Sequence, residues 1–76
     1  MNLKYLRTQA DLANALIYRI DKYWSLEMEE TIFISEIKEL VTMNLDLMTK
    51  DGEYTSIIRQ RLGKKRLTLL EKIMND

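Results

Sequence analysis

The stretch that decides the fold is TQADLANALIYRIDKYW, residues 8–24. At 100° per residue, its apolar side chains fall on one broad face and its polar side chains on the other, which is the pattern of an amphipathic helix. The hydroxyl of Thr8 can accept a hydrogen bond from the amide of Asp11, so we expect Thr8 to be the N-cap of this helix. The apolar face holds Leu12, Ala13, Leu16, Ile17, Ile20, Tyr23 and Trp24.

Two more helical patterns follow. The second is expected over residues 27–48, after Ser25 as a possible cap. Asn44 falls on its apolar face, and we expect it to be hydrogen-bonded because buried polar groups normally are. Asp51-Gly52 is a turn signal. The third helix is expected over residues 55–74, capped by Thr55 or Ser56.

These patterns predict an all-α fold, with residues 1–76 forming a single three-helix domain. All three helices have wide apolar faces, which favours a homodimer or a protein partner that covers the surplus. The expected core consists of Leu12, Leu16, Ile20, Trp24, Phe33, Ile37, Leu40, Val41, Ile58, Leu62, Leu69 and Ile73.

The composition argues against several functions. The chain has no Cys and no His, so it lacks disulfides, thiolate sites, the commonest metal ligand and the commonest general base. It also has no glycine-rich loop that could hold a phosphate. We therefore expect a protein that is not an enzyme and needs no metal, cofactor or small-molecule substrate.

The hydropathy pattern gives an expectation about location. No apolar run reaches the roughly 18–20 residues that span a bilayer. The first residues also lack the continuous apolar segment of a signal peptide. We therefore expect a cytoplasmic protein that does not act at a membrane.

The charges are unevenly distributed, although the net charge is zero. Residues 25–46 carry six acids and one base, whereas residues 47–76 carry seven bases and four acids. Such a distribution predicts either helices that pair with each other or two faces for different partners.

The basic stretch RQRLGKKR, residues 59–66, carries five positive charges and no acid. Its side chains could contact nucleic-acid phosphates or base edges. If Gly63 interrupts the helix, the region resembles a helix-turn-helix, although a one-residue turn is too short for that motif. The candidate binding residues, for a nucleic acid or an acidic partner, are Arg59, Gln60, Arg61, Lys64, Lys65 and Arg66.

The alternative is that this stretch forms a solvated face. Arg59 and Arg66 fall between two apolar strips of the third helix, where a half-buried arginine needs a carboxylate. The second helix offers three candidates, Glu36, Glu39 and Asp46. Our first functional hypothesis is a non-enzymatic interaction protein, a small regulator or adaptor whose contact surfaces are the acidic second helix and the basic third helix. The second is a nucleic-acid-binding protein that uses residues 59–66.

The stretch GEYTSIIRQRLGKKRL, residues 52–67, resembles a family of short proteins from low-GC Gram-positive bacteria and their phages or mobile elements. Residues 21–24, Asp-Lys-Tyr-Trp, are similar to the end of that family's first helix. The similarity covers most of the chain. The family has no assigned activity, so the resemblance implies a helical fold and a shared basic stretch, but no functional site.

Overall fold

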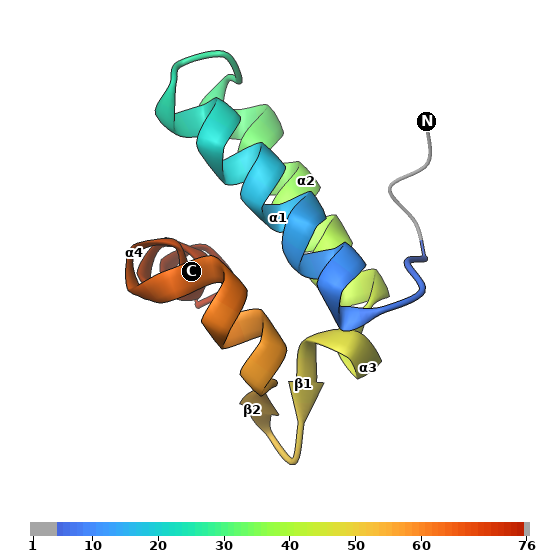
Figure 1. The fold of residues 1–76 in the computed structure, drawn as a ribbon. Coiled ribbons are helices and arrows are strands. Elements are labelled where there is room, and N and C mark those ends of the chain that lie inside the picture. The colour runs from blue at the N-terminus through green and yellow to red at the C-terminus, as the bar shows by residue number, and fades with distance from the viewer. Residues whose placement is uncertain (1–4, 76) are drawn as a thin grey trace.

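Helix α1 (Gln9–Trp24) forms where the amphipathic pattern predicts it in the computed structural model, which describes residues 5–75. The hydroxyl of Thr8 accepts a hydrogen bond from the amide of Asp11 at 3.0 Å, which confirms the predicted cap. Figure 1 shows α1 side by side with α2 (Glu30–Met43), and the two helices run in opposite directions.

The end of α1 has an unusual residue in its turn. Leu26 has a φ of 64°, in the left-handed region where glycine is usually found. Its amide donates to the carbonyl of Tyr23 at 3.1 Å, and the amide of Glu27 donates to the carbonyl of Lys22 at 2.9 Å. These two bonds close the helix C-terminus. Ser25 belongs to this turn, so the prediction that it caps the second helix was wrong.

The second helix is shorter than predicted. It ends at Met43 because Asn44 leaves the helical conformation, and a single turn, α3 (Leu45–Met48), follows. The buried Asn44 side chain donates to the carbonyl of Leu40 at 2.8 Å and accepts from the amide of Leu6 at 2.9 Å. The expectation that Asn44 is hydrogen-bonded is therefore confirmed, and its bonds hold the residues before α1 against the end of α2.

A small hairpin occupies the predicted turn. Strand β1 (Thr49–Lys50) pairs antiparallel with β2 (Glu53–Tyr54), with Lys50 opposite Glu53. Asp51 and Gly52 both have positive φ, at 55° and 83°, as a tight two-residue hairpin requires. The sequence indicated the turn but not the two short strands.

Helix α4 (Ser56–Met74) begins at the predicted cap, where Thr55 accepts from the amide of Ile58 at 3.3 Å. It bends at Gly63, whose φ of 80° and ψ of 171° are not helical. A Cβ placed at Gly63 would have no atom within 4 Å, so the glycine is required by the backbone conformation and not by close packing. Gly63 therefore interrupts the helix.

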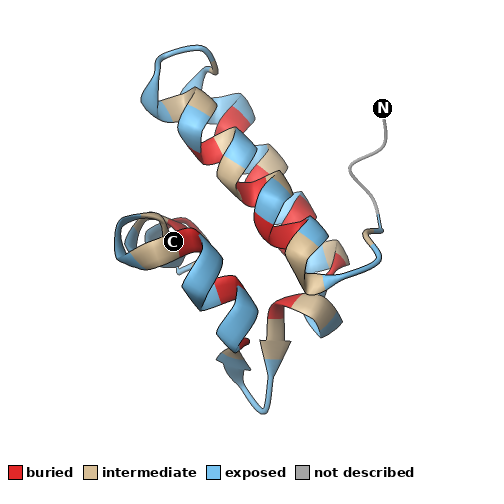
Figure 2. Ribbon diagram, in the orientation of Figure 1, coloured by how far each residue is buried: buried red, intermediate tan, exposed pale blue. Residues whose placement is uncertain are grey.

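The core lies between α1, α2 and α4, with α4 packed mainly on α1. Figure 2 shows buried residues recurring along these helices, whereas the α1–α2 loop and the hairpin tip are exposed. Two predicted core residues were wrong: Trp24 is 46% exposed and Leu69 is only partly buried. The bend at Gly63 rotates the second half of α4, so Leu70 is buried instead of Leu69. The buried apolar residues are Leu12, Ala13, Leu16, Ile20, Phe33, Ile37, Leu40, Val41, Met48, Ile58, Leu62, Leu70 and Ile73.

Residues 5–75 thus form a small, mostly helical domain with three main helices and a hairpin. Within these residues, no helix combines the length and the apolar character needed to cross a membrane.

Candidate binding surface on helix α4

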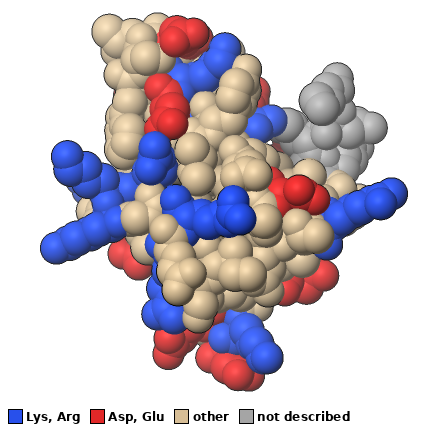
Figure 3. All heavy atoms as spheres, in the orientation of Figure 1, with Lys and Arg blue, Asp and Glu red and all other residues tan. Residues whose placement is uncertain are grey.

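Five of the six predicted binding residues are exposed on α4, on both sides of its bend. We call this set the basic surface; it consists of Arg59, Gln60, Arg61, Lys64 and Lys65. Figure 3 shows basic side chains projecting at the left, where α4 bends. Four positive charges are therefore available to solvent on one segment of α4.

Arg66 is the sixth predicted residue, and the structure separates it from the others. Its Nη2 donates to both carboxylate oxygens of Asp21, at 3.0 and 3.1 Å, and its Nε donates to Oδ1 at 3.2 Å. Its Nη1 also donates to the carbonyl of Leu62 at 3.1 Å, and its guanidinium lies 5.8 Å from the centre of the Trp24 ring. Arg66 therefore joins α4 to α1 and is not free for a partner.

The predicted pairing of Arg59 and Arg66 with the second helix was wrong. Arg66 pairs with Asp21 of α1, and Arg59 has no carboxylate within 4.0 Å among residues 5–75. Glu36 instead pairs with Arg19, at 3.0 Å between Oε1 and Nε, which joins α1 to α2. The phase of a helix predicts which side a residue faces, but the neighbour on that side depends on how the helices cross.

The other three bases of the basic surface resemble Arg59 in lacking a nearby carboxylate among residues 5–75. Within the described part of the chain, Arg61, Lys64 and Lys65 also have no carboxylate within ion-pairing distance. Exposed charges of this kind lose little solvation in the free protein and remain available for an oppositely charged partner. Ile57, one turn before Arg61, adds an exposed apolar side chain to this part of α4.

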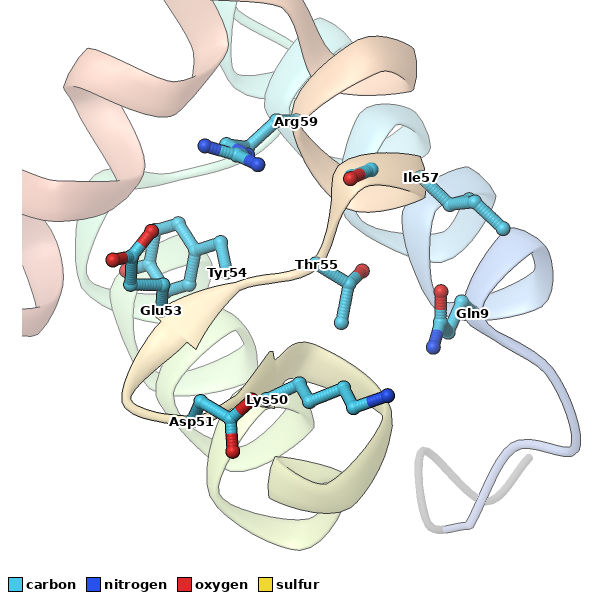
Figure 4. A pocket seen from close by; sticks show the side chains of 9 residues that line it. Gln9, Lys50, Asp51, Glu53, Tyr54, Thr55, Ile57 and Arg59 are labelled. Atoms are coloured by element: carbon cyan, nitrogen blue, oxygen red, sulfur yellow. The ribbon is translucent and has the colours of Figure 1, made fainter.

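A hollow of about 520 Å³ lies beside the basic surface, between the hairpin and the start of α4. In Figure 4, Arg59 lies on the side of Tyr54 and Glu53, whereas Lys50 extends toward Gln9. Burial raises the pKa of the Tyr54 hydroxyl, and the nearby carboxylate of Glu71 raises it further.

The charges around this hollow are mixed. Lys50 and Arg59 are balanced by Asp51 and Glu53, so charge does not favour an anion or a cation there. No three metal-binding side chains lie together anywhere within residues 5–75. The hollow therefore gives no chemical reason to prefer it over the exposed face of α4.

A second exposed feature joins acidic residues of the second predicted helix to two apolar residues whose exposure was not predicted from the sequence. At the α1–α2 turn, Trp24 is 46% exposed and Leu26 is 91% exposed, beside two exposed carboxylates from Glu29 and Glu30. We call these four residues the acidic tip. Trp24 and Leu26 line a hollow of about 640 Å³ there, together with both glutamates. The missing signal was the left-handed conformation of Leu26, which the sequence does not indicate because no glycine or asparagine stands there.

Lys22 is one of the bases near the acidic tip, because it pairs with Glu27, which lies between Leu26 and Glu29 in the chain. Its ammonium group lies 5.2 Å from the centre of the Tyr18 ring and 3.7 Å from a carboxylate oxygen of Glu27. A hydrogen bond to Tyr18 is the main reason that the pKa of Lys22 is raised. Lys22 is thus engaged by its own neighbours, and Glu29 and Glu30 have no ion pair within the described chain.

Fold and surface together define a small helical protein with separate acidic and basic exposed features. A family model described as a conserved hypothetical protein matches residues 3–75, and the chain belongs to that family. No curated protein matches the sequence, and no solved structure matches the fold.

Proposed function

We propose that this protein is a non-enzymatic regulator or adaptor that binds an acidic protein surface through its basic surface. One observation carries the proposal. Arg59, Arg61, Lys64 and Lys65 are exposed and have no carboxylate partner among residues 5–75, although the chain as a whole carries as many acids as bases.

The shape of α4 supports a protein partner. The bend at Gly63 changes the helix direction in the middle of the basic surface, so the four bases do not follow one straight stripe along a helix. After the bend, Leu70 and Ile73 are buried in the core, and Arg66 forms an ion pair with Asp21. The exposed residues of this half are Lys64, Lys65, Thr68, Glu71 and Lys72, and the acidic Glu71 among them does not favour contact with phosphates.

Nucleic-acid binding is the second candidate. It is favoured by the same four bases, because unpaired Lys and Arg side chains release counterions when they contact phosphates. The zero net charge works against it, because the protein as a whole does not attract a polyanion from a distance.

Fluorescence anisotropy separates the two candidates. The probes are a labelled peptide rich in Glu and Leu, labelled duplex DNA and labelled single-stranded RNA, each at low and near-physiological salt. The test variant is Arg61→Ala/Lys64→Ala/Lys65→Ala. The matched control is Lys38→Ala/Lys50→Ala/Lys72→Ala, which removes three exposed bases outside the basic surface.

Peptide binding that the test variant loses and the control keeps supports the proposal. Binding of DNA or RNA with the same dependence, and with a steep salt response, supports the second candidate instead. If neither peptide nor nucleic acid binds at low salt, where charge interactions are strongest, both candidates are wrong.

The resemblance of residues 52–67 also supports a proposed origin in low-GC Gram-positive bacteria or their mobile elements. A cytoplasmic location remains part of this proposal, and expression of a fluorescent fusion in such a host would test it.

A further inference from the structure

We infer that the acidic partner is a second copy of this chain, whose acidic tip docks on the basic surface in a two-fold symmetric dimer. The inference rests on the proposed function and names the partner of the same site. In this arrangement Glu29 and Glu30 of each copy meet Lys64 and Lys65 of the other.

The first argument is the position of the two features. The ion pair between Arg66 and Asp21 joins α4, just after its bend, to the last turns of α1. The backbone of Lys64 and Lys65 directly precedes Arg66, and the acidic tip lies at the end of α1, so both features lie close to this contact between α4 and α1. Figure 3 shows this region at the left and top left, with basic side chains over the bend and acidic side chains over the α1–α2 loop. A two-fold interface requires both complementary halves in one patch, since each copy supplies the same surface.

The second argument is the charge. Glu29 and Glu30 are exposed without a base partner, and Lys64 and Lys65 are exposed without an acid partner, among residues 5–75. In a two-fold dimer, the glutamates of each copy pair with the lysines of the other copy, so the same contact forms twice. The chain's net charge of zero means that two copies do not repel each other as they approach.

The third argument is the apolar surface beside these charges. Leu26 is 91% exposed in a backbone conformation that favours glycine, so the fold keeps an apolar side chain at a strained position where it contributes nothing to the core. Trp24 extends the apolar area and lies against Arg66. Apolar residues surrounded by charged ones are the usual anatomy of a protein interface. A chain of this length also benefits from association, because its core is small.

Another protein with a basic, apolar segment could also fit the acidic tip. A second copy explains both exposed features, because its basic surface complements the acidic tip and its acidic tip complements the basic surface.

Charge-swap variants test the inference by analytical ultracentrifugation over a concentration series. The first variant is Lys64→Glu/Lys65→Glu, and the second is Glu29→Lys/Glu30→Lys. Each places like charges across both contacts of its own dimer and should weaken association by more than about 100-fold. An equimolar mixture restores both contacts in a mixed dimer, so it should sediment as a dimer when neither variant alone does. The control Lys38→Glu/Lys50→Glu should dimerise like the wild type.

A third variant distinguishes loss of the dimer contact from misfolding of the monomer. Leu26→Asp changes only the exposed turn, and aspartate tolerates the left-handed conformation, so this variant should keep the helical circular-dichroism spectrum of the wild type and lose the dimer. The inference is overturned if the wild type is a monomer at every concentration, if the swapped variants still dimerise alone, or if their mixture stays monomeric. In the first case, binding of the acidic peptide would still leave the proposed function standing.

Discussion

Replacing Leu26 by glycine should stabilise the monomer, although the change removes a large apolar side chain. Leu26 occupies the position after the end of α1 with a φ of 64°. A side chain with a Cβ is crowded in that conformation, whereas glycine adopts it freely. Leu26 is 91% exposed, so its loss removes almost no buried apolar area.

The size of the effect follows from two opposing contributions. The left-handed conformation costs a residue with a Cβ about 1–2 kcal/mol. Glycine gives back about 0.5–1 kcal/mol, because its unfolded chain has more freedom to lose. Taken between the middle values of the two ranges, the difference is a gain of about 0.5–1 kcal/mol in the free energy of unfolding. For a domain of this size, that gain raises Tm by about 2–8 °C.

Thermal unfolding followed by circular dichroism measures this shift. The lowest workable protein concentration should be used, because association would stabilise the wild type and hide the effect. Leu26→Ala is the matched control, since it also removes the side chain but keeps the Cβ, and it should not raise Tm. A Leu26→Gly variant that melts at or below the wild-type temperature would refute the strain at this turn.

The other predictions concern stability. Gly63→Ala should cost about 1–3 kcal/mol, although space is open there, because its backbone conformation is essentially restricted to glycine; chemical denaturation measures this, and an unchanged midpoint would contradict it. Asp21→Ala removes the forked ion pair with Arg66 and should cost about 1 kcal/mol, less at high salt, because the pair is partly exposed; a loss independent of salt would point to packing instead. Leu62→Ala opens a cavity in the core and should cost about 2–5 kcal/mol, and an unchanged melt would remove Leu62 from the core. Burial raises the pKa of Tyr54 in the folded state, so stability present below about pH 10 should fall as the pH rises above it. Tyr54→Phe should make this fall shallower in denaturation curves at increasing pH, and equal slopes would show that Tyr54 titrates normally.

The sequence predicted the features that depend on neighbours close in the chain. The caps at Thr8 and Thr55 each involve a residue three positions away, so local composition is sufficient to indicate them. The turn at Asp51-Gly52 has the same local origin. Asn44 was expected to be hydrogen-bonded, but its bond to the amide of Leu6 crosses the fold and could not be anticipated.

What the sequence could not indicate depends on the geometry of helix packing. A continuous third helix would bury Leu69, but the bend at Gly63 rotates the second half and buries Leu70. The partner of Arg66 lies 45 residues earlier in the chain, at Asp21. Glycine in a helix is compatible with a bend, a close contact or a tolerated defect, and only the backbone angles distinguish these.

The sequence indicates the exposure of most residues of the basic surface. Exposure of Arg61, Lys64 and Lys65 follows from their charge, since isolated ionised side chains are rarely buried. Arg59 was expected to be half-buried between two apolar strips, but it is exposed. The apolar part of the acidic tip was missed, because Trp24 lies on the apolar face of α1 and yet is 46% exposed at the end of that helix.

The packing of α4 on α1 has a consequence for how the chain reaches its folded state. Helices α1 and α4 form the most extensive contact between elements within residues 5–75, so the core cannot close until α4 has been synthesised. Contacts between distant parts of a chain slow folding, even in helical proteins. A growing chain would hold the apolar faces of α1 and α2 uncovered during this interval, when association with other unfolded chains competes with folding.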